Sequence, residues 1–261
     1  MNSQILTEND GPIGRVIFNN PEKRNAFNLA MWRALPEALA ELNDREEIRA
    51  IILQGAGDQA FVAGADISEF EALRKDPAAA REYNAVTNRA FRAVAESPAP
   101  TIARIRGFCF GGGCAIALNS DLRIASADAR FCIPAAKLGL GYGYENVRRL
   151  ADELGPAAAR EMLFTARVYA ADEALRIGLI HQLVEAPGEL DERAADYAEL
   201  VARNAPLTVR SAKIALNEYT RGPAADVQKA DGAMDVCYES EDYREGVSAF
   251  LEKRKAAFRG R

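Results

Sequence analysis

The chain has 261 residues, of which 49% are apolar and 27% are charged, and its formal net charge is −5 at pH 7. This composition is typical of a globular protein whose core is large enough to need no disulfide or metal. The acidic balance argues against nucleic acid as the main partner, although a local basic patch could still bind an anionic small molecule.

Cysteine and histidine are scarce. The four cysteines form no CxxC pair and His181 is the only histidine, so a zinc site would lack ligands. We interpret Cys109, Cys114, Cys132 and Cys237 as small buried side chains in a reducing cytosol. The first residues, MNSQILTENDG, do not resemble a secretory signal, and no apolar run is long enough to cross a bilayer. We therefore expect a cytoplasmic protein with no metal and no membrane partner.

Strands and helices alternate along the first half of the chain. Residues 13–18, IGRVIF, alternate as in a strand, and the loop NNPEKRNAF leads into an amphipathic helix that begins after Asn28 and contains Pro36. Apolar periodicity further predicts a buried strand at 49–57, a loop entering a helix at 61–70, a helix at 77–97, a strand at 101–108, and a loop followed by a helix at 111–121.

The second half becomes helical towards its end. It begins with a strand pair at 122–131, a loop passing into a helix at 134–155, and a helix, turn, helix and strand over 160–185. Two helical stretches follow, at about 190–221 and 224–258, without a convincing strand. This order predicts an α/β fold with crossover units, divided into a core over residues 1–195 and a helical region over 196–261.

Three consecutive glycines, at positions 111–113, directly precede an apolar helical run. Glycine is costly to order, whereas free N–H groups at a helix start can hold an anion or polarise a carbonyl. Neither phosphate-binding signature is present. The loop VAGAD at 62–66 also joins a strand to a helix, so two loops could give two N–H donors to one oxygen, as an oxyanion hole requires. By spacing alone, tight packing explains the glycines equally well.

Several segments together resemble the crotonase superfamily, the enoyl-CoA hydratase/isomerase family of acyl-CoA enzymes. They are FVAGADISEF, APTIARIRGFCFGGGCAIALNSDLRIASADARF and ESEDYREGVSAFLEKRKAAF, and NNPEKRNAF and ADEALRIGLIHQLVE also fit the family pattern. The resemblance implies a spiral of ββα units and a helical C-terminal region that builds trimers, often paired into hexamers. It also implies an acyl-CoA thioester as the substrate, with coenzyme A entering as part of that substrate and no separate cofactor.

The resemblance assigns roles to backbone as well as to side chains. It implies that the N–H groups of Ala65 and Gly112 hold the thioester oxygen while an enolate forms, and that bare glycine backbone lets this oxygen approach. Lys253, in FLEKRK, matches a lysine that reaches coenzyme A, sometimes from a neighbouring subunit. The rest of the implied coenzyme A cleft consists of Lys23, Arg24, Ala26 and the backbone near Ala63.

The sequence departs from the hydratase pattern at both catalytic glutamates. Ala115 and Ala135 occupy their positions, and alanine can neither accept nor deliver a proton. Gly143 stands where two other branches carry an aspartate. Tyr142 matches a tyrosine of the methylmalonyl-CoA decarboxylase branch, although that branch has a histidine at the position of Ala65.

Tyr142 and Glu145 remain as candidate acid or base groups. Glu145 and Asn146 replace two family glycines near the water site of hydratases, so Glu145 is expected to face the reacting carbons. In the competing interpretation, Glu145 lies in the first turn of a helix and only stabilises the helix dipole. Tyr142 could likewise only line the pocket. We expect Asp66 to organise its loop and His181 to be structural.

The leading hypothesis is an enzyme that stabilises a thioester enolate and is a decarboxylase or an isomerase. Decarboxylation generates the enolate without a strong base, whereas double-bond isomerisation needs one base, for which Glu145 could serve. A hydratase in which Glu145 positions the water, and a non-catalytic homologue that only binds acyl-CoA, remain alternatives.

Overall fold

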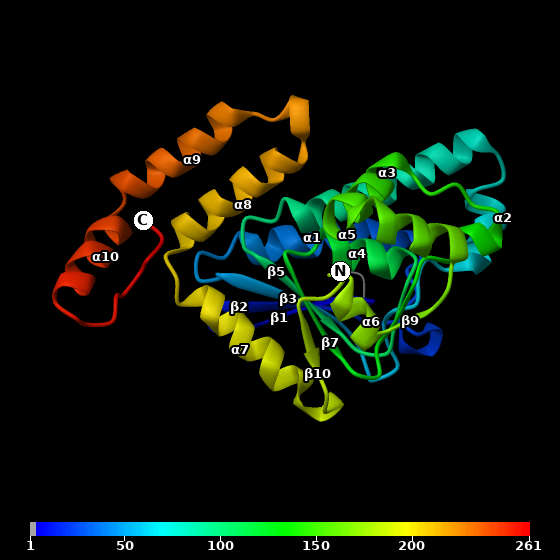
Figure 1. The fold of residues 1–261 in the computed structure, drawn as a ribbon, viewed down its shortest axis with the longest axis horizontal. Helices are drawn as coiled ribbons and strands as arrows, with labels where there is room; N and C mark the ends of the chain where they lie inside the picture. Colours follow the sequence, from blue (N-terminus) through cyan, green and yellow to red (C-terminus); the bar gives the residue numbers. More distant parts are fainter. Residues whose placement is uncertain (1–3) are drawn as a thin grey trace.

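Two β-sheets form the centre of the computed structural model, which describes residues 4–261 (Figure 1). The large sheet has the strand order β1-β2-β3-β5-β7-β10, with the bounds Ile5–Asp10, Ile13–Phe18, Ala50–Gly55, Thr101–Ile105, Leu122–Ser126 and Gln182–Val184. The small sheet has the order β4-β6-β8-β9, with the bounds Ala60–Val62, Phe108–Phe110, Arg130–Cys132 and Tyr169–Ala170.

Each turn of the chain gives one strand to each sheet. The pairs β3 and β4, β5 and β6, and β7 and β8 divide in this way, and a helix follows each pair. Pairing within both sheets is parallel except for β1 with β2 and β8 with β9. This repetition confirms the predicted spiral of ββα units.

The helices divide into a group around the sheets and a group at the C-terminal end. The first group consists of α1 (Leu29–Asn43), α2 (Phe70–Leu73), α3 (Pro77–Ala95), α4 (Gly112–Asn119), α5 (Tyr144–Thr165), α6 (Ala171–Arg176) and α7 (Leu190–Ala202). The second consists of α8 (Pro206–Thr220), α9 (Val227–Glu239) and α10 (Glu241–Leu251), which extend as an arm away from the core (Figure 1). Among these helices, none is both long and apolar enough to span a membrane.

Both faces of the large sheet are buried. Alternate residues of β3 point to opposite sides, so Ile51 and Leu53 join the main core with α1, α3 and α4, whereas Ile52 faces α7. Ala194 and Ala198 of α7 complete this second cluster. The proposed boundary at residue 195 therefore falls inside a helix that covers the sheet, and residues 1–3 of the proposed core lie outside the described residues.

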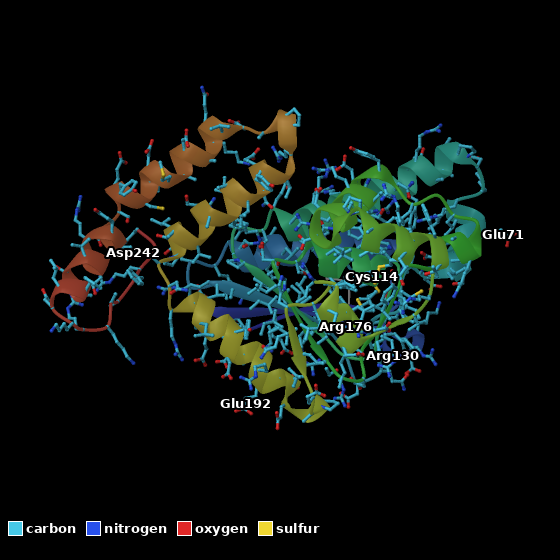
Figure 2. All side chains as sticks on the ribbon, viewed as in Figure 1. Glu71, Cys114, Arg130, Arg176, Glu192 and Asp242 are labelled. Carbon is cyan, nitrogen blue, oxygen red and sulfur yellow. The ribbon has the colours of Figure 1, made fainter. Side chains whose placement is uncertain are left out.

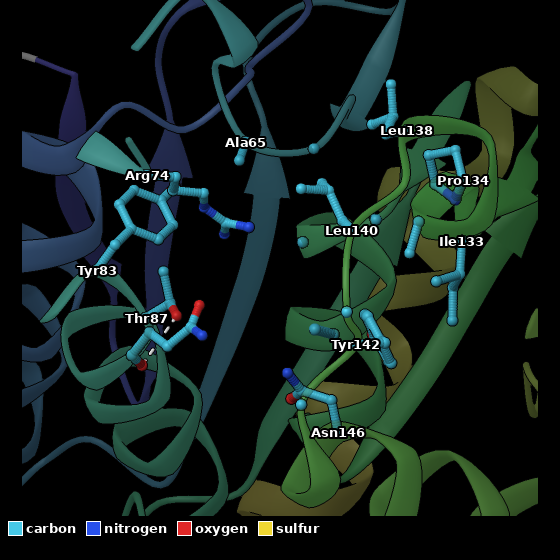
Figure 3. A pocket seen from close by; sticks show the side chains of 18 of the residues that line it. Ala65, Arg74, Tyr83, Thr87, Ile133, Pro134, Leu138, Leu140, Tyr142 and Asn146 are labelled. Carbon is cyan, nitrogen blue, oxygen red and sulfur yellow. Dashed lines mark hydrogen bonds between the residues drawn. The ribbon is translucent and has the colours of Figure 1, made fainter. Parts of the chain in front are cut away.

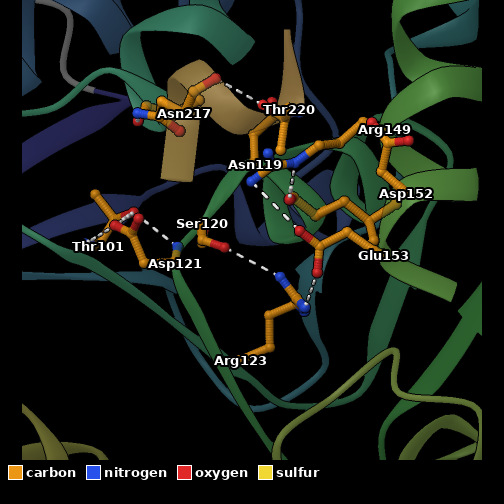
Figure 4. Close-up of polar contacts among 12 residues, drawn as sticks. Thr101, Asn119, Ser120, Asp121, Arg123, Arg149, Asp152, Glu153, Asn217 and Thr220 are labelled. Atoms are coloured by element: carbon orange, nitrogen blue, oxygen red, sulfur yellow. Dashed lines mark hydrogen bonds and ion pairs between the residues drawn. The ribbon is translucent and has the colours of Figure 1, made fainter. Parts of the chain in front are cut away.

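Polar contacts attach the C-terminal arm to the core. Lys213 of α8 is 7% exposed and its Nζ lies 2.7 Å from the Asp121 carboxylate, which also accepts from the Thr101 amide at 2.7 Å. Asn217 donates to the Ala95 carbonyl at 2.9 Å. Figure 4 shows Asp121 with its partner Thr101, close to the buried Arg123. The first helix of the arm is therefore fixed to the sheet through buried charge, not only through apolar packing.

Several element boundaries differ from those predicted. The stretch 190–221 divides into α7 and α8 because Pro206 lacks the N–H that a continuous helix needs. The stretch 224–258 also divides, because the Ser240 hydroxyl accepts from the Tyr243 amide and starts a new helix, and α10 ends at Leu251. The segment 61–70 enters its helix from β4 and not from a loop alone.

Candidate active site

Of the two backbone-rich loops predicted to cooperate, VAGAD is held in place by the loop NNPEKRNAF. The Ala63 amide donates to the Arg24 carbonyl at 3.0 Å, the Phe27 amide donates to the Gly64 carbonyl at 2.8 Å, and the Asp66 amide donates to the Phe27 carbonyl at 2.8 Å. This pairing uses the Gly64 carbonyl and the Asp66 amide, and it leaves the Ala65 N–H without a protein acceptor among residues 4–261.

Each of the three glycines meets a different requirement. Gly111 has a φ of 50°, which disfavours any larger residue. A Cβ on Gly112 would lie 2.9 Å from Cζ2 of Trp32 and 3.8 Å from the Ala65 nitrogen. A Cβ on Gly113 would lie 2.3 Å from the Val62 carbonyl oxygen. Close packing therefore explains Gly113, whereas Gly112 also places its free helix N-terminal amide next to that of Ala65.

A cavity of about 160 Å³ opens between these loops, α3 and the loop before α5 (Figure 3). Ala63, Ala65, Gly112, Ala115 and Ala135 all line it, so the two alanines that replace the family glutamates share one space with the two amides. Among residues 4–261, those lining the cavity include no Asp, Glu, His, Lys or Cys. The described part of the chain thus offers the cavity free amides but no side chain that could act as a base near neutral pH.

Tyr142 lines the cavity on the same wall as Leu140 and Asn146 (Figure 3). Its hydroxyl is buried and has no hydrogen-bond partner among the described residues. Burial, with a smaller contribution from the neighbouring Cys114, raises the pKa of Tyr142 above its ordinary value. The phenol therefore keeps its proton at neutral pH, and its O–H has no protein acceptor among the described residues.

Glu145 does not line the cavity, although it was expected to face the reacting carbons. It is absent from the residues that line the cavity, its side chain is 64% exposed, and its carboxylate lies 3.2 Å from Nη2 of Arg148, one turn along α5. Its place in the first turn of α5 agrees with the alternative interpretation of a carboxylate that favours the helix dipole.

The implied coenzyme A residues of the first loop have protein partners. Lys23 Nζ lies 2.6 Å from the Asp66 carboxylate, and this bond, followed by that from the Ser68 hydroxyl, lowers the pKa of Asp66. The Arg24 guanidinium lies 5.0 Å above the ring of Phe108. Asp66 organises its loop as predicted, because it also accepts from the Ser68 amide at 3.1 Å. Ala26 lies in the same loop, half-buried.

Lys253 lies far from the other predicted residues within one chain. It follows α10, at the end of the arm opposite to α2 and α3 (Figure 1), and it is exposed. The structure therefore does not bring Lys253 to the cavity of its own chain.

The remaining predicted side chains are structural. His181 Nδ1 accepts from the Arg123 amide at 3.0 Å, and burial together with the Arg123 charge lowers the pKa of His181. Cys114 is fully buried (Figure 2), as are Cys109 and Cys132, all as free thiols, whereas Cys237 is half-buried. Within residues 4–261 no three side chains of His, Cys, Asp or Glu are grouped as they would be to hold a metal ion.

Arg74 and Tyr83 line the cavity although no sequence motif predicts them. Tyr83 and Thr87 start the apolar stripe that faces the core along α3, so helical periodicity marks them only as packing residues. Trp32 Nε1 donates to the Tyr83 hydroxyl at 2.9 Å, which connects the wall below Gly112 to α3. The only feature of the sequence that could have indicated Arg74 as a cavity residue is its position directly after the helix that follows the VAGAD loop.

The cavity thus lies within a spiral of ββα units, and the backbone of Ala65 and Gly112 lines it. The chain belongs to the enoyl-CoA hydratase/isomerase family, whose model matches residues 8–261. It is 37% identical to the short-chain-enoyl-CoA hydratase of Clostridium acetobutylicum, over 97% of this chain and 96% of that protein. It is 33% identical to the methylmalonyl-CoA decarboxylase of Escherichia coli, over 93% of each. The crystal structure of an enoyl-CoA hydratase/isomerase family protein from Hyphomonas neptunium superimposes with a TM-score of 0.94, at 37% identity, over 100% of this chain and 99% of that one.

Proposed function

We propose that this enzyme decarboxylates a short malonyl-type acyl-CoA thioester. The observation that carries the proposal is a cavity with two free amides, at Ala65 and Gly112, for which residues 4–261 supply no carboxylate, histidine or lysine. Isomerisation and general-base hydration both require a group that accepts a proton, and Glu145 lies outside the cavity. Loss of CO2 forms an enolate without such a group.

The proposed reaction has two steps. The bond between C2 and the carboxylate breaks, its electron pair moves into the C1–C2 bond, and CO2 leaves. The negative charge collects on the thioester oxygen, where the N–H groups of Ala65 and Gly112 donate to it; two preorganised donors of this kind stabilise an oxyanion more than the neutral carbonyl. C2 then takes a proton from the Tyr142 hydroxyl, and water returns a proton to the phenolate.

Tyr142 suits the second step although its pKa is raised. An enolate carbon is far more basic than a phenolate, so the transfer stays favourable. A raised pKa keeps the phenol protonated between turnovers, so the donor is present whenever a substrate binds. The similarity to a methylmalonyl-CoA decarboxylase supports this choice of reaction, and the similarity to a short-chain-enoyl-CoA hydratase supports a short acyl group.

The test is a panel of thioesters in heavy water, with products followed by mass. Purified protein receives methylmalonyl-CoA, malonyl-CoA, crotonyl-CoA and a 3-enoyl-CoA. We expect CO2 release from a malonyl-type thioester, with one solvent deuterium at C2. Addition of water to crotonyl-CoA without CO2 release, or tight binding without any turnover, would instead indicate a hydratase or a non-catalytic acyl-CoA-binding protein.

The proposed assembly is a homotrimer or a hexamer in the cytoplasm, with no cofactor beyond the coenzyme A of the substrate. The arm exposes large apolar side chains: Tyr219 is 81%, Phe250 83% and Leu251 74% exposed, as at surfaces that other chains cover. A neighbouring copy would also explain how Lys253 reaches coenzyme A. Lys253→Glu should then raise KM for a coenzyme A thioester much more than for the matching pantetheine thioester, and equal effects on both would contradict this assignment.

A further inference from the structure

Arg74 brings an unpaired positive charge into the cavity. It follows α2, and its guanidinium points from the wall of Tyr83 towards that of Leu140 (Figure 3). Its Nε is buried without a hydrogen-bond partner, and no carboxylate of residues 4–261 forms an ion pair with it. The side chain as a whole is half-buried, so its outer nitrogens remain open to the cavity. A cation placed in a cavity without a carboxylate partner favours an anionic group on the ligand.

Two aromatic rings hold the guanidinium in place. Its central carbon lies 4.4 Å from the ring centre of Phe70 and 4.3 Å from that of Tyr83. Tyr83 is itself fixed by the bond from Trp32 Nε1 at 2.9 Å. Cation–π contacts use the face of the guanidinium, so the N–H groups at its edge that do not interact with the Tyr83 hydroxyl stay available for a planar anion such as a carboxylate.

The size of the cavity indicates which part of the ligand carries the anion. At about 160 Å³ it is close to an engineered cavity of ~150 Å³ that binds benzene, so the enclosed space suits about six heavy atoms. Because Ala65 and Gly112 line the same space, a thioester carbonyl held there leaves room for a short acyl group with a carboxylate.

We propose that Arg74 is a specificity-determining residue that selects thioesters whose short acyl group ends in a carboxylate. The argument rests on the proposed function for the position of the thioester. In a decarboxylation the carboxylate loses its charge as CO2 forms, so this ion pair is stronger in the ground state than in the transition state. Arg74 therefore improves substrate binding rather than the rate of the chemical step.

The test compares two thioesters that this enzyme should bind without turnover. Succinyl-CoA and butyryl-CoA have acyl chains of equal length, and only the first ends in a carboxylate, which is one carbon too far from the thioester to leave as CO2. By calorimetric titration we expect the wild type to bind succinyl-CoA at least about tenfold more tightly. Arg74→Met and Arg74→Gln should reduce that ratio to within about threefold by weakening succinyl-CoA alone.

Lys75→Met is the matched control. Lys75 is the exposed neighbour of Arg74 and does not line the cavity, so its loss changes the net charge equally and should leave the preference intact. Absence of any preference in the wild type would overturn the proposal. So would equal weakening of succinyl-CoA, butyryl-CoA and free coenzyme A by Arg74→Met, because the guanidinium would then bind the phosphates. An Arg74-dependent preference without CO2 release from any thioester would refute the proposed decarboxylation and leave this inference standing.

Discussion

Replacing Gly112 by alanine and by proline separates the role of its amide from the role of its missing side chain. A Cβ there would lie 2.9 Å from Cζ2 and 3.0 Å from Cη2 of Trp32. Carbon atoms prefer a separation of ~3.5–4.0 Å, so the indole or the start of α4 must shift by roughly 0.5–1 Å. We expect each variant to lose about 1–3 kcal/mol of unfolding free energy through overpacking. Proline adds the loss of the N–H, at a helix position that tolerates it.

The ratio of the two turnover rates measures the amide. If the Gly112 N–H donates to the developing oxyanion, proline should be ~10²–10³-fold slower than alanine, which corresponds to about 2.7–4 kcal/mol of transition-state stabilisation. Turnover is followed as CO2 release, and urea unfolding shows whether the two variants are equally stable. Gly188→Ala, where an added Cβ meets nothing within 4 Å, is the control for glycine replacement. Rates of the proline and alanine variants within about threefold of each other would refute the oxyanion assignment.

Three further predictions follow from the site and from the arm. Tyr142→Phe should lower turnover ~10²-fold or more because it removes the proton donor. It should also raise the unfolding free energy by about 1 kcal/mol, because it removes a buried hydroxyl without a partner among the described residues. A variant as active as the wild type would exclude Tyr142 as the proton donor. Glu145→Gln should change turnover less than about threefold, since its carboxylate pairs with Arg148 outside the cavity; a large loss would restore Glu145 as the acid or base. Burial, opposed by Asp121, lowers the pKa of Lys213, so at alkaline pH the unfolded chain binds a proton that the folded chain has released. Unfolding free energy should therefore rise with pH as it approaches the unfolded value of ~10.4, and Lys213→Met should abolish that rise in urea titrations at several alkaline pH values.

The spiral was predictable because its parts carry strong local signals. Ile13–Phe18 alternates, Ala50–Gly55 is an apolar run, and Gly155 followed by Pro156 marks the break at which α5 kinks, with a φ of 77° at the glycine. The edge strand Ile5–Asp10 was missed because Glu8 and Asp10 face water, and an exposed edge gives no apolar alternation. The local pattern of apolar residues therefore identified the buried elements. It missed the exposed edge strand, whose formation depends on pairing with β2.

The candidate site shows the same difference between residues that local pattern indicates and residues whose position depends on tertiary contacts. Ala65, Gly112 and Tyr142 lie in segments with fixed spacing, which the resemblance could use, and all three line one cavity, while their catalytic roles stay predictions. The direction of the Glu145 side chain depends on the residue at which α5 starts. Its carboxylate forms an ion pair with Arg148, one turn further along that helix, instead of facing the cavity. Arg74 enters the cavity only because Phe70 and Tyr83 hold it, a contact across two helices that no local pattern contains.

Trp32 is the only tryptophan of the 261 residues, and it lines the cavity between Gly112 and Tyr83. Indole fluorescence of the intact protein therefore originates at one place, within contact distance of any bound acyl group. The fluorescence of Trp32 can therefore report ligand binding in the wild-type protein. Quenching or a spectral shift on adding a thioester would give the occupancy of this cavity directly, without a label, and stopped-flow mixing would resolve the binding step before any chemistry.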